Sequence, residues 1–451
     1  MRKIGFNSVI IYLAVLPIIA FLSSCSDEYY LNAIPSNSTA IVAVEPESLL
    51  GGNNGGFPDW LGLDAADDCG IDLSAKMYIF ETANGDVGLS AKVDDEDKLG
   101  EWLDNLSSKG HCKKVSRHKD LGFTVLKDSW VIGFSSSTVM AMGPALPSQQ
   151  TEFRRQITKY LEQDEEQGIK GSQLYARLDS MNSAVAVVAM LSALPEKFAA
   201  PLTLCVPKNT DASQVMLQAS LDIDDNGCCV IDGEVFSFDE NINKSIRQSY
   251  NIFRPIQGKY AANVPAKSAL SVFMNVDGQQ FINLLHANKT FQSLLLGMNM
   301  AVDMDNIIKS INGDAAVVLN NVSDIGKGLR MCAQLGSRSF LDDVDYWKQS
   351  CPAGSRITDL GKDAYCFTNT DLTYCFGVSQ DMQFYAGGTE EEAKGLLSAA
   401  SEPLPQTVQN KIKGQRLVML LNLDTLLGQQ GAGGYVKSVL GDTNTVLLIM
   451  K

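Results

Sequence analysis

Two short motifs contain residue types that could bind a metal or form an acyl-enzyme, but each lacks part of its pattern. Residues 222–227, DIDDNG, match the first half of a calcium loop, whose twelfth position should carry a bidentate acid. That position is Gly233, and both flanks alternate like strands, so we predict a tight β-turn. Residues 116–119, SRHK, match the S-x-x-K pattern of serine acyl-enzymes, but no K-T-G box accompanies them. We therefore expect neither a calcium site nor a serine nucleophile at these positions.

The sequence offers few other residues that could bind a metal or a phosphate. His111, His118 and His286 lack the spacing of metal ligands, and no Cys-x-x-Cys supports zinc or thioredoxin-type chemistry. The methionines of GMNMAVDM, residues 297–304, could bind copper, but they alternate with apolar residues, which favours a helix core. The glycine-rich residues 428–434 lack the Lys-Ser/Thr end of a phosphate loop. The sequence thus predicts no metal site, no cofactor and no catalytic residue.

Cys25 is the cysteine with the clearest chemical role. Arg2 and Lys3 precede an apolar run at residues 9–21, and Leu22-Ser23-Ser24-Cys25 follows, which is the layout of a secretory signal. The last four residues resemble the bacterial lipobox, in which the cysteine is acylated and becomes the first mature residue. The apolar run is shorter than the roughly 18–20 residues that a membrane span needs. We therefore predict a signal peptide at 1–24, lipidation at Cys25, an acidic tether at 25–32 and attachment to the lipid bilayer.

The remaining nine cysteines are an odd number, so they cannot all pair within one chain. An extracytoplasmic location permits disulfides, and Cys366 and Cys375, which flank a hairpin turn, are the best candidate pair. The adjacent Cys228 and Cys229 point to opposite faces of a strand and should not bond each other.

The composition narrows the classes of function. A chain of 451 residues suggests two or three domains, and 45 % hydrophobic residues can fill a substantial core. The net charge of −15 argues against nucleic acid as a partner, because phosphate binding needs clustered positive charge. The 52 acidic residues leave open a glycan-processing hydrolase that uses two dispersed carboxylates.

A repeat spaced by 230 to 245 residues organises the chain. IPSNSTAIVAV at 34–44 matches VPAKSALSVFM at 264–274, and Trp102 matches Trp347 in a similar helical pattern. We also match Asp120-Leu121-Gly122 with 359–361, and Gly171, Leu174 and Leu178 with Gly414, Leu417 and Leu421. Collinear matches predict an internal duplication, with chance similarity as the alternative.

The predicted fold class is α+β. We expect two similar modules, each an antiparallel sheet with helices packed on one face, at residues 33–255 and 256–451. The first module carries an extra hairpin, with strands at 214–223 and 228–238, followed by a helix at 240–253. The apolar residues 184–194, AVAVVAMLSAL, are too few to cross a bilayer and predict a buried helix.

The four tryptophans, Trp60, Trp102, Trp130 and Trp347, could form a platform on which sugars stack. Two of them occupy the same repeat position on an amphipathic helix, which favours packing in a core. Glycan binding therefore remains the alternative to a structural role.

The chain resembles a family of uncharacterised lipoproteins of the Bacteroides group that is defined only by a domain of unknown function. The resemblance rests on LSSC, the SDEYY that follows it, and the IPSNSTAIVAVEPESLL opening, and it spans most of the chain. The acidic start also resembles the export signal of surface lipoproteins in that group. The resemblance implies an outer-membrane lipoprotein, on the periplasmic side or at the surface, and no known activity. We expect a binding or organising role, with a glycan hydrolase or a glycan-binding lipoprotein as alternatives.

Overall fold

The computed structural model describes residues 28–50, 69–194, 202–224, 227–288, 302–320, 328–427 and 443–451, with residues 199, 291, 292 and 295. These residues form a mixed α/β protein whose strands pair mostly antiparallel, as predicted. The signal peptide, Cys25 and Trp60 lie outside the described residues. No helix in the described ranges is long and apolar enough to span a membrane.

The chain divides into two compact units. Unit 1 comprises Met1–Ser38 and Asp68–Ala176, and unit 2 comprises Thr39–Asp67 and Arg177–Lys451. The chain passes from unit 1 to unit 2 within helix α6 (Gln173–Asp179). The border predicted between residues 255 and 256 separates the two repeated modules, and these modules are defined differently from the compact units. That border stays a prediction.

Unit 1 is built on one antiparallel sheet with strand order β2-β3-β7-β6-β5-β4. Its elements are η1 (Tyr29–Leu31), β2 (Met77–Glu81), β3 (Val87–Lys92), α4 (Glu96–Ser108), β4 (Ser116–His118), β5 (Leu121–Leu126), β6 (Trp130–Phe134), β7 (Thr138–Gly143), α5 (Gln150–Leu161) and η2 (Ile169–Gly171). Helix α4 begins where the Asp95 carboxylate accepts the backbone N–H groups of Asp97 and Lys98 at 3.0 Å. Its buried residues, Leu99, Leu103 and Leu106, lie at helical spacing on one face.

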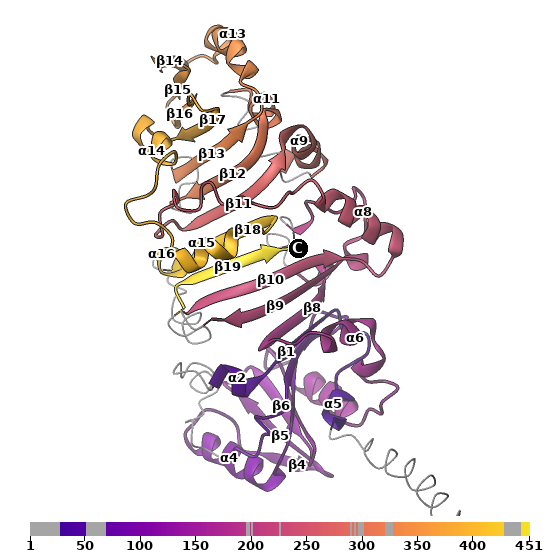
Figure 1. Cartoon of the computed structure of the whole chain (residues 1–451). Helices are drawn as coiled ribbons and strands as arrows, with labels where there is room; N and C mark the ends of the chain where they lie inside the picture. The colour runs from indigo at the N-terminus through magenta and orange to yellow at the C-terminus, as the bar shows by residue number, and fades with distance from the viewer. Residues whose placement is uncertain are drawn as a thin grey trace, which may run out of the picture. The chain divides into compact units, whose positions relative to one another are not determined.

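Unit 2 contains a longer row of strands, which Figure 1 shows from β13 through β11, β18, β19 and β10 to β8. Its full order is β14-β15-β16-β17-β13-β12-β11-β18-β19-β10-β9-β8-β1, in which β10 and β19 pair parallel and the other neighbours pair antiparallel. The strands are β1 (Ala40–Val44), β8 (Val185–Met190), β9 (Met216–Ile223), β10 (Cys228–Phe236), β11 (Leu270–Asp277), β12 (Ile311–Leu319), β13 (Leu329–Leu335), β14 (Arg356–Gly361), β15 (Ala364–Thr368), β16 (Thr373–Val378), β17 (Gln383–Gly387), β18 (Leu417–Asn422) and β19 (Thr445–Met450). Its helices are α2 (Pro46–Leu50), α8 (Glu240–Tyr250), α9 (Gly278–Ala287), α11 (Met304–Lys309), α13 (Val344–Ser350), α14 (Glu390–Gly395), α15 (Gln406–Ile412) and α16 (Leu423–Leu427).

Both faces of the unit 2 sheet are covered, so the prediction of helices on one face is wrong for this unit. Successive strand residues such as Phe273 and Met274 enter two different hydrophobic clusters. One cluster contains residues of α9, α11 and α13, and the other contains residues of α15. The physical reason is that β11 and β12 carry apolar residues on both of their faces, and such strands need cover on both sides.

Residues 184–194 contain a strand, and the helix predicted there is wrong. β8 lies between β1 and β9, and it pairs antiparallel with both of them. Its valines have stiff, β-branched side chains that favour a strand, and a short apolar run alone does not distinguish a central strand from a buried helix.

Candidate binding site

A cavity of about 460 Å³ opens in unit 2 at one end of strands β11, β12 and β13. Its walls come from the segment before β11 and from three neighbouring strands. The lining residues are Arg254, Pro255, Ile256, Gln257, Asn275, Asn312, Gly313 and Gln334. One arginine and four amide side chains therefore surround this space.

An irregularity in β12 shapes the cavity. The pairing of β12 with β13 shifts register between Ile311 and Ala315, so three residues of β12 lie opposite Gln334. Gly313 has φ +146°, and a Cβ added there would lie 2.7 Å from the Gln334 Oε1 atom. Glycine is needed at this position for both its conformation and its lack of a side chain.

Asp314, which follows this glycine, fixes the segment that forms the opposite wall. It is 2 % exposed, and its carboxylate accepts the backbone N–H groups of Gln257 and Lys259, each at 2.9 Å. The Asn275 amide donates to the same carboxylate at 2.8 Å. The buried charge is thus satisfied by three donors, and it holds the wall in place before any ligand arrives.

Two buried polar atoms at this site have no hydrogen-bond partner among the described atoms, Asn275 Oδ1 and Arg254 Nε. The Asn275 amide nitrogen donates to Pro255 O at 3.2 Å as well as to Asp314, which determines the orientation of the amide. The Arg254 guanidinium donates to Val276 O at 2.6 Å. The site therefore holds one spare acceptor and one spare donor beside neutral amides.

This arrangement suits binding better than acid–base chemistry. The described lining residues include no carboxylate, and the neighbouring Asp314 already accepts three hydrogen bonds. A hydrolase of the two-carboxylate type needs an acid and a base on either side of the bond that it cleaves. Amides and one arginine instead offer a polar ligand both donors and acceptors.

Replacing Asp314 with Asn should lower the free energy of unfolding by about 2–4 kcal/mol, because an amide turns an N–H toward donors that are already buried. Asp342→Asn is the matched control, since Asp342 is exposed, and it should change the value by less than about 0.5 kcal/mol. Urea unfolding of the three proteins measures the difference. Equal midpoints for all three would show that Asp314 does not hold the wall.

Sequence reasoning missed this site. Its signal was the polar residues Asn275 and Asp314 inside strands that are mostly apolar, together with a glycine directly before Asp314. A buried polar residue in such a run needs a partner, and here each is the partner of the other.

The motifs singled out in the sequence lie elsewhere in the fold. In the turn between β9 and β10, Asp224 accepts the Cys228 N–H at 2.9 Å and pairs with Lys411, while Asp225 and Asn226 lie outside the described residues. Ser116 lies on strand β4, where its hydroxyl donates to Phe123 O at 3.4 Å. The Nε2 atom of His286 lies 2.9 Å from Oδ2 of Asp305. The described residues contain no cluster of three potential metal ligands.

Three of the four tryptophans lie in the described residues, and they are buried to different degrees. Trp347 on α13 is 7 % exposed and packs against Phe376, with ring centroids 6.2 Å apart. Trp102 and Trp130 are half-buried, so the expectation that Trp102 is buried like Trp347 is wrong. Trp102 follows the buried Leu99 by three positions, at the border of the apolar face of α4.

Cys366 and Cys375 lie directly opposite each other on β15 and β16, with Cα atoms 4.0 Å apart, and a disulfide joins them. Seven other described cysteines form no disulfide, and five of these are buried: Cys69, Cys205, Cys228, Cys229 and Cys332. Burial raises the pKa of Cys205 and of Cys229 from 9.0 to about 12. These thiols therefore favour the folded state below about pH 9, and that contribution is lost as the pH rises toward 12.

Thiol labelling should separate these seven cysteines by burial. At pH 8 in the folded protein we expect an aromatic disulfide reagent to modify the half-buried Cys112 and Cys351 first. The five buried thiols should react at least about 100-fold more slowly until urea unfolds the chain. Peptide mass spectrometry locates the labels, and rapid modification of Cys205 or Cys229 would contradict the described packing.

Comparison with known proteins identifies a family but no activity. No curated protein matches the chain. Two solved structures are similar to part of it, crystal forms I and IV of TP0453, with 9 % and 10 % sequence identity and TM-scores of 0.28 and 0.29. They cover 42 % and 45 % of this chain, and 72 % and 80 % of their own chains. Likenesses this slight support no conclusion about fold or function. The model of one domain of unknown function, DUF4836, matches residues 63–425. Because this match spans most of the chain, the protein belongs to the DUF4836 family.

Proposed function

We propose that this protein is a lipid-anchored lipoprotein of the Bacteroides group that binds a polar ligand at the outer membrane. The anchor rests on Leu22-Ser23-Ser24-Cys25 after a short apolar run. The binding role rests on the amide-lined cavity of unit 2, whose wall is held by Asp314. Periplasmic and surface-exposed sides of the membrane both remain compatible with this proposal.

The single observation that favours binding over catalysis is the lining itself. Four neutral amides and one arginine surround the cavity, and the nearby carboxylate is fully hydrogen-bonded. A neutral or anionic ligand with hydroxyl or amide groups suits these donors and acceptors. The alternative function, glycan hydrolysis, would need a second carboxylate beside this cavity.

The test uses two lining residues whose side chains are exposed and do not hold the fold. Gln257 contacts Asp314 through its backbone alone, and the Asn312 side chain makes no hydrogen bond among the described atoms. A panel of neutral oligosaccharides and short peptides is first screened for ligands that raise the melting temperature of the wild type. The doubly substituted Gln257→Ala, Asn312→Ala protein should show no such rise with these ligands. Asn182→Ala with Gln248→Ala removes two exposed amides elsewhere and serves as the control.

Two results would contradict the binding proposal. Stabilisation that survives the double substitution would place the ligand elsewhere. Chromatography of the panel after incubation should recover each oligosaccharide intact, and cleavage products would establish the hydrolase instead.

We also propose that the chain arose by duplication, as the sequence matches predict. The strand order supports this proposal. The unit 1 order β2-β3-β7-β6-β5-β4 corresponds, strand for strand, to the order β12-β13-β17-β16-β15-β14 in unit 2. In the same way, the order β1-β8-β9 corresponds to β11-β18-β19. Backbone contacts also agree, since Ser36 N donates to Gln167 O at 3.1 Å and Ala266 N donates to Glu402 O at 3.0 Å.

One pair of sequence matches does not fit the duplication. Leu174 and Leu178 lie on helix α6, whereas Leu417 and Leu421 lie on strand β18. In the first copy, α6 follows the backbone contact between Ser36 and Gln167. In the second copy, helix α15, with its buried Val408 and Ile412, follows the equivalent contact between Ala266 and Glu402. Isolated leucines are poor markers of equivalence because helices and strands both bury them.

A further inference from the structure

A basic strip lies on unit 1 of this acidic protein. Residues 109–119, KGHCKKVSRHK, contain five Lys or Arg residues and two histidines but no Asp or Glu, whereas the whole chain carries −15. All seven of these basic residues are exposed. The strip joins α4 to β5 and includes β4 at the end of the unit 1 strand order.

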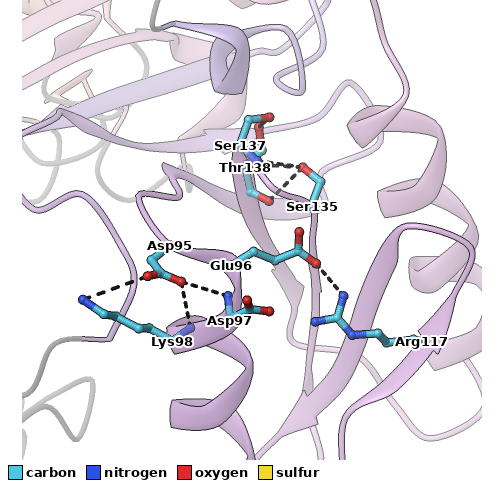
Figure 2. A network of polar contacts seen from close by, with 8 residues as sticks. All are labelled: Asp95, Glu96, Asp97, Lys98, Arg117, Ser135, Ser137 and Thr138. Atoms are coloured by element: carbon cyan, nitrogen blue, oxygen red, sulfur yellow. Dashed lines mark hydrogen bonds and ion pairs between the residues drawn. The ribbon is translucent and has the colours of Figure 1, made fainter.

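Most of these charges have no acidic partner. Arg117 pairs with Glu96 of α4, which Figure 2 shows reaching toward it from the first turn of the helix. The Lys113 ammonium donates to the neutral Gln150 amide at 3.0 Å. Lys109, Lys114 and Lys119 form no ion pair within the described ranges. Asp104 and Asp120 lie nearby in sequence, so the strip keeps a surplus of positive charge beside these acids.

The backbone of the strip is ordered by pairing with the sheet. β4 pairs antiparallel with β5, and the backbone of Cys112 forms an isolated antiparallel β-bridge with that of Leu126. Lys113 N donates to Val125 O at 2.9 Å, and Lys127 N donates to His111 O at 2.8 Å. The backbone of the strip is therefore held on β5 at β4 and at Lys113, while Lys109 caps the end of α4 and Lys119 lies in the turn after β4.

The N-terminal tether belongs to the same unit. Glu28 pairs with Lys170 at 2.8 Å, and the following Tyr30 and Leu31 are buried. Three residue steps from Cys25 to Glu28 span at most about 11 Å. A lipid on Cys25 would thus keep Glu28, and with it unit 1, close to the membrane.

We propose that the basic strip docks unit 1 onto the anionic phosphate headgroups of the membrane that carries the anchor. This proposal rests on the proposed lipid anchoring for its setting. Clustered lysines near an anionic surface each contribute attraction that falls off within a Debye length. The acyl chains would fix the protein to the bilayer, and the strip would fix which side of unit 1 faces the bilayer.

The test omits the lipid, so its outcome does not depend on acylation. The chain from Ser26 to Lys451 contains every described residue, and it should sediment with vesicles of 30 % phosphatidylglycerol in phosphatidylcholine at 50 mM NaCl. Vesicles of phosphatidylcholine alone, or 500 mM NaCl, should leave it in solution. Changing Lys109, Lys113, Lys114 and Lys119 to Gln should weaken the partition roughly 100-fold.

The matched control removes four exposed lysines of unit 2: Lys208, Lys244, Lys362 and Lys413, each changed to Gln. It has the same net charge as the strip variant and should bind like the wild type. Equal loss in both variants would show that net charge alone acts, and that result would overturn the proposal. Binding to a soluble heparin oligosaccharide without binding to the anionic vesicles would also overturn it.

Discussion

Cys25→Ala should release the protein from the membrane fraction and abolish its labelling by a palmitate analogue. The sequence offers one acceptor in the lipobox-like segment, so no second cysteine there can replace it. The expected effect is close to complete, because the proposed acyl chains on Cys25 would supply the stable attachment and a headgroup contact alone is reversible.

Ser24→Ala is the matched control for that change. It alters the residue before the cysteine to another small residue and should leave both labelling and membrane attachment intact. Washing the membranes with 500 mM NaCl removes any contribution from the basic strip. A Cys25→Ala protein that still sediments with the membranes after this wash would contradict lipid anchoring.

Trp347→Ala should lower the free energy of unfolding by about 3–5 kcal/mol through the cavity that it leaves. Trp347 is 7 % exposed and lies in the main hydrophobic cluster of unit 2 with Phe376, Phe367 and Ile357. Trp102→Ala should cost less than half as much, because that side chain is half-buried.

Tyr346→Ala gives the control on the same helix. Tyr346 is 69 % exposed, so its removal should cost less than about 0.5 kcal/mol. Urea unfolding followed by tryptophan fluorescence and circular dichroism measures each value. A Trp347→Ala protein as stable as Tyr346→Ala would mean that this tryptophan is not part of the core.

The sequence predicted the elements better than their arrangement. α4 and α5 carry clear helical spacing, and the Asp-Gly-rich turn correctly predicted the β9–β10 hairpin. Residues 184–194 failed as a helix because a short apolar run has no periodicity that separates the two structures. The strand order of unit 2 depends on long-range pairing, such as β13 with β17 and β10 with β19, and local spacing does not specify it.

The candidate binding site was beyond local patterns for the same reason. Arg254, Asn275, Asp314 and Gln334 come from four separate segments, and the fold brings them together through pairing of β11, β12 and β13. The buried positions of Asn275 and Asp314 were nevertheless visible as polar residues in apolar strands. The basic strip, by contrast, is contiguous, and the structure added its ordered backbone and its unpaired lysines.

The mass of the N-terminal peptide, isolated from the membrane fraction of cells that express the full chain, tests the lipid anchor most directly. The peptide should begin at Cys25 and carry the added mass of acyl chains on that residue, with residues 1–24 removed. An N-terminal peptide that begins at Met1, or at an unmodified residue after Cys25, would contradict the lipid-anchored account.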